Sequence, residues 1–335
     1  MRPTFTPRLI NGPYDDPGLL VPLTFARRSL LFDLGDLAAL SSGDLLKISH
    51  IFVTHTHMDH FIGFDRVVRM FLGRSKNLHL FGPPGILANV AGKLKGYTWN
   101  LVQNYEEFLR LSVTEIHPRR AISRIFNCRD GFRLSTRHSR TLNGPVILQE
   151  PAFRVCAAML NHRIACLGFS IEEQFHVNIL KSRLAALQLA VGPWIAEFKR
   201  LLFENADPQG TFEIPASTSN PVARRFRLGE LAAQVTRISP GQKVGYIADA
   251  AFTPENVRRM IDLVRGADQL FIEAAFLHSE KDIAAFKSHL TARQAGSIAR
   301  QAGVKQMTVF HFSPRYTGQA HLLEQEAQRA FQGLD

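Results

Sequence analysis

Short apolar runs separated by glycine, proline and aspartate dominate the first third of the chain. Such runs predict strands joined by turns, whereas apolar positions that recur every three or four residues predict helices. The pattern predicts strands at residues 19–25, 29–36, 51–53 and 78–83, and helices around residues 37–46, 64–72 and 86–94. Because strands and helices are interleaved, we expect an α/β or α+β protein.

The middle of the chain returns to short strands and then breaks. Strand patterns between residues 132 and 148, and at 153–160 and 165–173, predict a second sheet. From about residue 174 to residue 241, helical segments lead into the stretch IPASTSNPVARRF, which is rich in Pro, Ser, Thr and Asn. This composition predicts an inserted arm that projects from the main body.

The last third alternates regularly between the two kinds of element. Thr253 before Pro254, and Thr291 further on, are typical signals for the start of a helix. The pattern predicts strands at residues 243–249, 269–276 and 306–312, and helices at residues 254–266, 291–303 and 319–331.

Composition changes this picture mainly through charge. The chain has 335 residues, of which 45% are hydrophobic, so it can bury a substantial core. Forty Lys and Arg residues against 29 Asp and Glu give a formal net charge of +11, and 30 of those 40 are Arg. Because the planar guanidinium pairs well with phosphate oxygens, the charge favours a phosphate-bearing partner.

Cysteine usage and the N-terminus bear on the compartment. Three cysteines at unpatterned spacings argue against a disulfide framework and against a cysteine-based zinc site. No apolar signal segment, transit-peptide pattern or run of about 18 apolar residues occurs. We therefore expect a cytoplasmic protein without membrane contact.

The sequence THTHMDH follows the buried strand at residues 51–53 and carries four potential metal ligands, namely His55, His57, Asp59 and His60. In an extended segment His55 and His57 point to the same side, and a turn can bring Asp59 and His60 to a neighbouring position. Imidazole and carboxylate ligands together suit zinc, manganese or iron at a catalytic site. The alternative is a solvated histidine-rich loop, which the preceding apolar strand disfavours.

This motif resembles the metal-binding signature of the metallo-β-lactamase superfamily, and other segments resemble its ribonuclease Z branch, which processes the 3′ end of tRNA. In that family's order they are NHRIACLGF (161–169), YIAD (246–249), IEAAF (272–276), HLT (289–291) and HFSPRY (311–316). The resemblance implies a four-layer αββα sandwich, in one domain over residues 1–335 with an inserted arm at about 174–241.

The resemblance also implies a site that binds two zinc ions, with Mn²⁺ or Fe²⁺ as alternatives. His55, His57 and His162 would hold one ion and Asp59, His60 and His311 the other, with Asp249 bridging them. Asp59 would orient or deprotonate the attacking water. His289 would stabilise the scissile phosphate or protonate the departing 3′-oxygen, and Glu273 would orient His289.

Some of these assignments have structural alternatives. His162 could be an ordinary strand histidine, and Asp249 could cap the helix that begins at Pro254. We expect the histidines outside the motifs to serve the surface or the packing: His50, His79, His117, His138, His176, His278 and His321.

The chain departs from the family pattern at several positions. Ile272 stands where the family has the His of HEATF, which would remove a polar group behind the metals. Ala248 and Ala250 replace the Gly and Thr of an SGDT element, and Met58 replaces a Gly and adds bulk beside the metals. The segment DLGDLAAL (33–40) only loosely follows the family's DCGEGTQ.

Arginines form two groups along the chain, at residues 119–140 and 224–227. Such groups are usually solvated, but beside a phosphodiesterase site they suggest contacts with RNA phosphates. We expect substrate contacts from Arg120, Arg124, Arg225 and Arg315.

The sequence therefore predicts an endoribonuclease that cuts precursor tRNA at its 3′ trailer and leaves a tRNA 3′-hydroxyl. A homodimer is the family's common assembly. Two alternatives stay open at this point. One is a hydrolase of the same fold that acts on another phosphodiester or ester, such as a small cyclic nucleotide, and the other is an RNA-binding protein that has lost catalysis.

Overall fold

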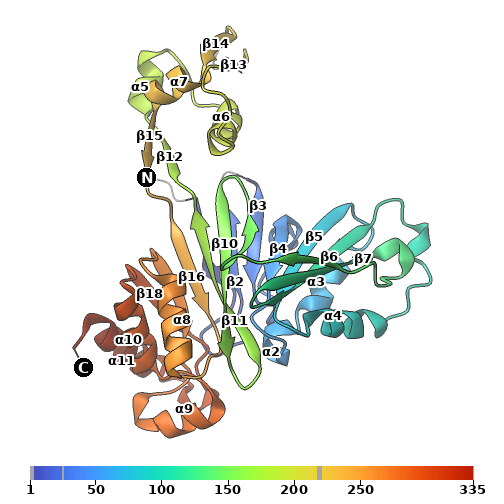
Figure 1. The fold of residues 1–335 in the computed structure, drawn as a ribbon, viewed down its shortest axis with the longest axis vertical. Helices are drawn as coiled ribbons and strands as arrows, with labels where there is room; N and C mark the ends of the chain where they lie inside the picture. Colours follow the sequence, from blue (N-terminus) through green and yellow to red (C-terminus); the bar gives the residue numbers. More distant parts are fainter. Residues whose placement is uncertain (1–3, 25, 217–220, 335) are drawn as a thin grey trace.

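Two mixed β-sheets packed face to face form the centre of the computed structural model, which describes residues 4–24, 26–216 and 221–334 (Figure 1). The first sheet has eight strands in sequence order: β1 (Arg8–Leu9), β2 (Leu19–Leu23), β3 (Arg28–Phe32), β4 (Ile48–Phe52), β5 (Lys76–Gly82), β6 (Leu109–His117), β7 (Arg120–Asn127) and β8 (His138–Thr141). From β3 to β6 the neighbouring strands run parallel.

The second sheet has six strands, in the order β18 (Gln306–Phe310), β17 (Gln269–Glu273), β16 (Lys243–Ile247), β11 (Ala165–Glu173), β10 (Phe153–Asn161) and β9 (Val146–Gln149). Strands β16, β17 and β18 are parallel to one another. Their carboxyl ends therefore meet at one edge of the sandwich, and side chains that follow these strands come together there.

Helices cover the outer face of each sheet (Figure 1). Those associated with the first sheet are α1 (Ser42–Lys47), α2 (Met58–Phe61), α3 (Phe64–Phe71) and α4 (Ile86–Lys95). Those associated with the second are α8 (Pro254–Val264), α9 (Lys281–Lys287), α10 (Ala292–Ala302) and α11 (Ala320–Gln332). Four short 3₁₀ turns complete this part: η1 (Val102–Asn104), η2 (Cys128–Asp130), η3 (His278–Glu280) and η4 (Pro314–Tyr316).

The alternation of side chains along the central strands explains the layers. In β4, Ile51 packs into the core under the helices of the first sheet, whereas Phe52 packs into the core between the two sheets. In β17, Leu270 faces the helix layer and Phe271 faces the other sheet. Strands buried on both faces need continuous apolar runs, which is the pattern that the sequence carries.

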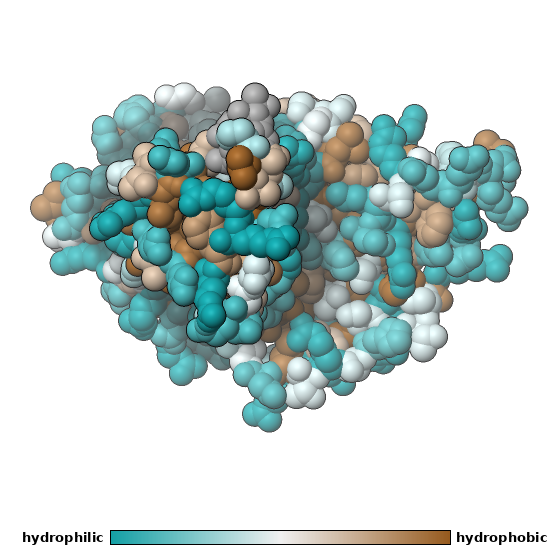
Figure 2. All heavy atoms as spheres, turned by 90° about the horizontal axis from the view of Figure 1, so that it is seen from above, coloured by the Kyte–Doolittle hydropathy of each residue, from teal (hydrophilic) through white to brown (hydrophobic). Residues whose placement is uncertain are grey.

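A narrow extension leaves the second sheet between β11 and β16 (Figure 1). Its base is the antiparallel pair β12 (His176–Ile179) and β15 (Thr236–Ser239). It carries α5 (Lys181–Ala186), α6 (Trp194–Phe203), β13 (Thr211–Ile214), β14 (Arg224–Arg227) and α7 (Leu228–Val235) around an apolar cluster of its own that includes Phe198. Seen end on, its tip presents hydrophilic side chains with hydrophobic ones between them (Figure 2).

The structure corrects two sequence expectations. Residues 132–148 were assigned to the second sheet, but β8 pairs with β7 in the first sheet, and only β9 joins the second. The long hairpin of β6 and β7 was not predicted, although Leu109, Leu111 and Val113 alternate with more polar residues along β6. The stretch IPASTSNPVARRF at 214–226 includes residues 217–220, which lie outside the described residues.

Candidate metal centre

The candidate ligands gather at the edge where parallel strands of both sheets end. His55 and His57 follow β4, and Asp59 and His60 belong to α2 directly after them. His162 lies in the turn between β10 and β11. Asp249 and His311 follow β16 and β18. All seven residues that were expected to bind metal are therefore brought to one place.

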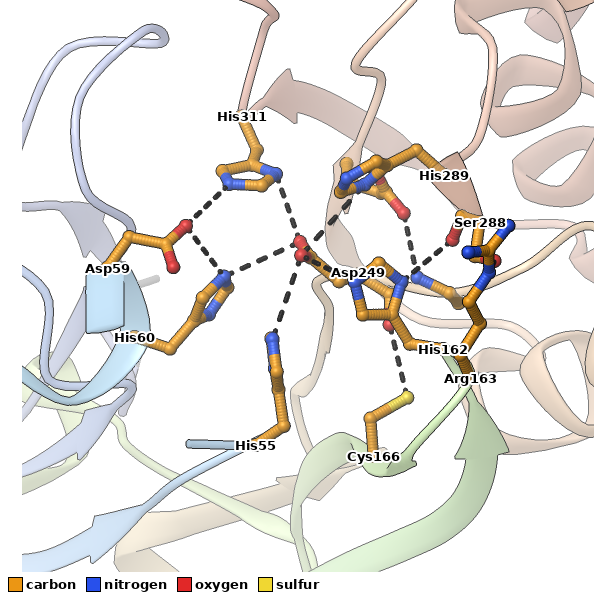
Figure 3. Close-up of polar contacts among 12 residues, drawn as sticks. His55, Asp59, His60, His162, Arg163, Cys166, Asp249, Ser288, His289 and His311 are labelled. Atoms are coloured by element: carbon orange, nitrogen blue, oxygen red, sulfur yellow. Dashed lines mark hydrogen bonds and ion pairs between the residues drawn. The ribbon is translucent and has the colours of Figure 1, made fainter. Parts of the chain in front are cut away.

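The Asp249 carboxylate occupies the centre of this group, with histidine rings around it (Figure 3). Its Oδ2 atom lies 3.7 Å from His55 Nε2 and 3.4 Å from His162 Nε2. Its Oδ1 atom lies 3.5 Å from His60 Nε2 and 3.0 Å from His311 Nδ1. Each carboxylate oxygen thus faces one of the two expected ligand sets.

Asp59 and His57 complete these two sets. Asp59 Oδ2 lies 3.4 Å from His60 Nε2 and 3.3 Å from His311 Nε2. The His57 ring centroid lies 4.4 Å from that of His55 and 5.3 Å from that of His162. The side chain of Asp59 is 40% exposed, whereas that of Asp249 is 3% exposed. Asp59 can therefore exchange protons with solvent, which the buried Asp249 cannot do readily.

The donor atoms fit divalent metal ions. Two groups of mutually close ligand atoms coincide with the expected sets, namely His55, His57, His162 and Asp249 in one and Asp59, His60 and His311 in the other. Four buried atoms in these groups have no hydrogen-bond partner: His55 Nε2, His60 Nε2, Asp249 Oδ1 and His311 Nδ1. Because buried polar atoms are rarely left unpaired, these atoms fit a site that binds a cation.

The far side of each histidine ring fixes its orientation. His162 Nδ1 donates to the backbone carbonyl of Ser288 at 2.8 Å, which leaves Nε2 toward Asp249. His60 Nδ1 donates to Asp33 Oδ2 at 2.9 Å, and its Nε2 likewise faces the centre. Metal-binding histidines in proteins are held in the same way by a carbonyl or carboxylate behind the ring.

Asp33 is a site residue that the sequence analysis missed. Its side chain is fully buried and accepts hydrogen bonds from Thr54 Oγ1 at 2.9 Å and from Tyr246 Oη at 3.0 Å, as well as from His60. The residue adopts a φ of +58°, a conformation that a non-glycine residue rarely takes. The signal was present, since Asp33 begins the segment that loosely follows the family's DCGEGTQ.

Electrostatics within the site show an excess of buried negative charge. Although burial disfavours its charged form, His60 has a pKa well above its usual range because Asp249 and Asp33 lie beside it. Burial likewise opposes the charged form of His311, but Asp249 raises its pKa to about 10. Positive charge is therefore favoured at this place, and a divalent cation held by these groups would supply it.

His289 and Glu273 lie next to this group. His289 Nδ1 donates to Glu273 Oε2 at 2.9 Å, and the Ala250 backbone amide donates to Glu273 Oε1 at 2.7 Å. The His289 ring centroid lies 4.8 Å from that of His162. Both oxygens of the buried Glu273 are thus engaged, so this carboxylate is fixed behind the His289 ring.

The departures from the family pattern lie outside the ring of ligands. Ile272 is fully buried in the core beneath the helices of the second sheet, so it faces away from the metal centre. It lies on the opposite face of β17 from Glu273, whose carboxylate accepts from His289. Ala248 and Ala250 are buried, and the Met58 side chain is 77% exposed, so its bulk extends into solvent.

The four arginines expected to contact substrate lie in separate parts of the molecule. Arg120 and Arg124 belong to β7, and Arg225 belongs to β14 in the extension, where it pairs with Glu213 at 2.8 Å. Arg315 follows His311 and pairs with Glu280, with its guanidinium 5.6 Å from the centre of the Phe276 ring. They do not form one patch.

Among the histidines outside the motifs, His50, His79 and His176 make contacts within the fold. The buried His50 stacks on His79 with ring centroids 4.8 Å apart, and the buried His176 lies 3.1 Å from Glu173. His138 and His321 are exposed.

An αββα sandwich whose two sheets deliver a histidine and aspartate cage to one edge defines the metallo-β-lactamase fold. Two solved structures of this kind match nearly the whole chain. The short form of human tRNase Z matches with a TM-score of 0.51 and 16% identity, covering 92% of this chain and 93% of its own. The metallo-β-lactamase fold protein YhfI of Bacillus subtilis matches with a TM-score of 0.55 and 15% identity, covering 97% and 92%.

Sequence comparison gives the family. No protein-family model matches the chain. A Ribonuclease Z of Deinococcus radiodurans is 30% identical over 294 residues, which are 86% of this chain and 83% of that protein. The chain belongs to the ribonuclease Z family, and the expected fold and class of enzyme, a metal-dependent endoribonuclease, are confirmed. Among the described residues, no helix is long and apolar enough to cross a membrane.

Proposed function

We propose that this chain is a zinc-dependent endoribonuclease that removes the 3′ trailer from precursor tRNA and leaves a tRNA 3′-hydroxyl. The observation that carries the proposal is the position of the Asp249 carboxylate between two sets of histidines. Its Oδ2 faces His55 and His162, and its Oδ1 faces His60 and His311. A carboxylate that offers one oxygen to each of two histidine sets suits a bridge between two cations. The names of the relatives support RNA as the substrate.

The chemistry of the donors supports zinc. All the proposed ligands offer imidazole nitrogen or carboxylate oxygen, which zinc accepts readily. Cys166 is the nearby thiol, and its Sγ donates to the Asp249 backbone carbonyl at 3.1 Å. The thiol is thus turned to the backbone rather than to the ligand atoms, and burial, followed by the charge of Asp249, raises the pKa of Cys166 well above its usual range.

Divalent ions at such a centre lower the pKa of water and offset the negative charge of a phosphodiester. We assign the remaining steps to side chains of this chain. Asp59, which is held by His60 and His311 and reaches solvent, orients the attacking water and takes its proton. His289, with Glu273 behind its Nδ1, presents Nε2 to the departing 3′-oxygen and gives it a proton.

Further features of the proposal concern binding and assembly. We assign phosphate contacts to Arg120, Arg124, Arg225 and Arg315, and we treat residues 1–335 as one domain with an arm at about 174–241. We also propose a cytoplasmic location and a homodimer, whose mass light scattering would measure. The three cysteines are free and buried, in keeping with a reducing compartment.

Cleavage of a precursor tRNA and of bis(p-nitrophenyl) phosphate by the zinc-loaded and manganese-loaded chain tests the proposal. We expect a tRNA 3′-hydroxyl and a trailer 5′-phosphate, and about two metal ions per chain. Asp249→Asn should lower the cleavage rate by more than about 100-fold. Loss of a residue that only supports a metal ligand typically costs about 10- to 100-fold, and Asp249 is proposed to bind the metals directly. The exposed Asp36→Asn is the matched control.

Three results would contradict the proposal. Turnover of the small diester without cleavage of RNA would identify a hydrolase of another phosphodiester. RNA binding without metal or cleavage would identify a binding protein. Full activity of Asp249→Asn would exclude the bridging role.

A further inference from the structure

Three exposed apolar side chains lie near the proposed metal ligands along the chain, two of them on loops and one in the last turn of α9. Ile164 is 42% exposed in the β10–β11 turn, Phe252 is 46% exposed after β16, and Phe286 is 72% exposed near the end of α9. Each follows or precedes a proposed site residue by two or three positions along the chain, namely His162, Asp249 and His289. Exposed aromatic groups at such a place are candidates for ligand contacts.

Hydrogen bonds join the two loops and the end of α9. The Ala251 amide donates to the Asn161 carbonyl at 2.9 Å, which ties the loop after β16 to the β10–β11 turn. Arg163 Nε donates to Ser288 Oγ at 3.2 Å, and its Nη2 donates to the Phe286 carbonyl, which ties the end of α9 to the same turn. We call Arg163, Ile164, Phe252 and Phe286 the apolar rim.

Arg163 and Phe286 form a stacked pair within the rim. The guanidinium carbon lies 5.2 Å from the centre of the Phe286 ring, a distance typical of a cation–π contact. Two hydrogen bonds from the same guanidinium fix its position, as Figure 3 shows for Ser288. Although Arg163 lies against its ring, the Phe286 residue is 72% exposed to solvent.

We propose that the apolar rim holds an unpaired nucleotide of the RNA next to the scissile phosphate, with its base stacked on Phe286 and its phosphate paired with Arg163. This inference rests on the proposed function and adds to it a binding site for one nucleotide that flanks the cut. Stacking on an exposed aromatic ring beside an arginine is the usual way in which proteins grip unpaired bases without reading their sequence.

The location supports a nucleotide over other occupants. Ser288 accepts a hydrogen bond from His162 through its backbone carbonyl and another from Arg163 through its hydroxyl. One residue therefore positions a proposed metal ligand and a member of the rim. His289, the proposed proton donor, is the next residue. A base on Phe286 would therefore belong to a nucleotide that adjoins the reacting phosphate.

The experiment compares single-turnover cleavage of an intact precursor tRNA with cleavage of precursors that lack one base at each position flanking the cut. We expect Phe286→Ala to slow cleavage of the intact precursor by about 5- to 100-fold, because loss of one stacked base has effects of this size. The precursor that lacks the base stacked on Phe286 should be cleaved by the wild type about as slowly as Phe286→Ala cleaves the intact precursor. On that abasic precursor the cleavage rates of the wild type and Phe286→Ala should be nearly equal. Phe286→Tyr, which keeps the ring, should restore cleavage.

Leu101→Ala is the matched control, since Leu101 is also an exposed apolar side chain, at 62%, but lies in the first half of the chain beside η1. It should leave cleavage unchanged. The rim proposal is overturned if Phe286→Ala cleaves the intact precursor as fast as the wild type, or if its loss is the same for every abasic precursor. A change in mass on light scattering with Phe286→Ala would instead make the rim a subunit contact.

The rim and the proposed function fail in different ways. If the metal-loaded wild type cleaves no RNA at all, both are wrong. If the wild type cleaves precursor tRNA but Phe286→Ala does so equally well, the function stands and the stacking site is wrong.

Discussion

The carboxylate of Asp33 accepts a 2.9 Å hydrogen bond from His60 Nδ1 and so directs His60 Nε2 toward Asp249. Asp33 lies at the end of β3, a strand that contributes none of the proposed ligands. The proposed metal centre is thus held in part by a residue outside the segments that carry the candidate ligands.

Asp33→Asn should weaken metal binding and RNA cleavage by about 10- to 100-fold, the range for residues that hold a metal-binding histidine. The amide offers one acceptor oxygen where the carboxylate now receives bonds from His60, Thr54 and Tyr246. Metal titration and single-turnover cleavage would measure the effect. The exposed Asp36→Asn is the control, and equal metal affinity in the two variants would show that Asp33 does not support the site.

His289→Ala should slow cleavage of precursor tRNA by about 10² to 10⁴-fold, the contribution of a positioned general acid. It should slow turnover of bis(p-nitrophenyl) phosphate by much less, because p-nitrophenolate leaves without a proton. Comparing the two substrates at one pH measures the difference. An equal loss with both would mean that His289 stabilises the phosphate rather than protonating the leaving group.

Acid should destabilise the protein partly through His50, which is remote from the metal centre. Burial, followed by the neighbouring His79, lowers the pKa of His50 from 6.5 to about 3. The unfolded chain therefore binds a proton below pH 6.5 that the folded chain refuses, so stability is complete above that pH and falls as the pH drops toward 3. At pH 5 the loss is about 2 kcal/mol.

Replacement of His50 tests this pH dependence. His50→Phe, which keeps a ring beside Phe52 and Phe81, should reduce the loss of unfolding free energy between pH 7 and pH 5 by about 2 kcal/mol. Denaturant unfolding at both pH values measures it. The exposed His321→Gln should keep the wild-type dependence, and an unchanged slope in His50→Phe would refute the assignment.

Two helix glycines should respond oppositely to a methyl group. A Cβ on Gly296 of α10 would lie 2.1 Å from the Ala327 carbonyl oxygen of α11, whereas a Cβ on Gly92 of α4 meets nothing within 4 Å. Gly296→Ala should cost about 1–3 kcal/mol of stability because backbone must move. Gly92→Ala should gain about 0.5–1 kcal/mol through helix propensity. Thermal unfolding compares the two, and a stable Gly296→Ala would show that the helices are not packed this closely.

The helices and strands of the last third could be predicted because local signals agree with burial there. Thr291 caps α10 through the amide of Gln294, and Thr253 caps α8 before Pro254, as the sequence indicated. The strand β8 could not be assigned to its sheet, because all four of its residues are exposed and carry no apolar pattern. Sheet membership there is decided by pairing with β7, which is a tertiary contact.

The proposed ligands could be picked out from the sequence because THTHMDH is dense and the other motifs keep their order. Their supports were less accessible. Ser288 holds His162 through its backbone carbonyl. Because every residue has a backbone carbonyl, the sequence does not indicate which one accepts this hydrogen bond. Ile272 was expected to matter for the site, yet the alternation of β17 turns its side chain to the helix layer. Which face a strand residue takes follows from the register of the sheet.

The order of the ligands along the chain also governs when activity can begin. His55 lies near the start of the chain, whereas His311 follows β18, the last strand of the second sheet. A growing polypeptide therefore has no complete centre until its final strand has docked beside β17. Cleavage by a refolding chain should therefore begin only after both sheets have formed.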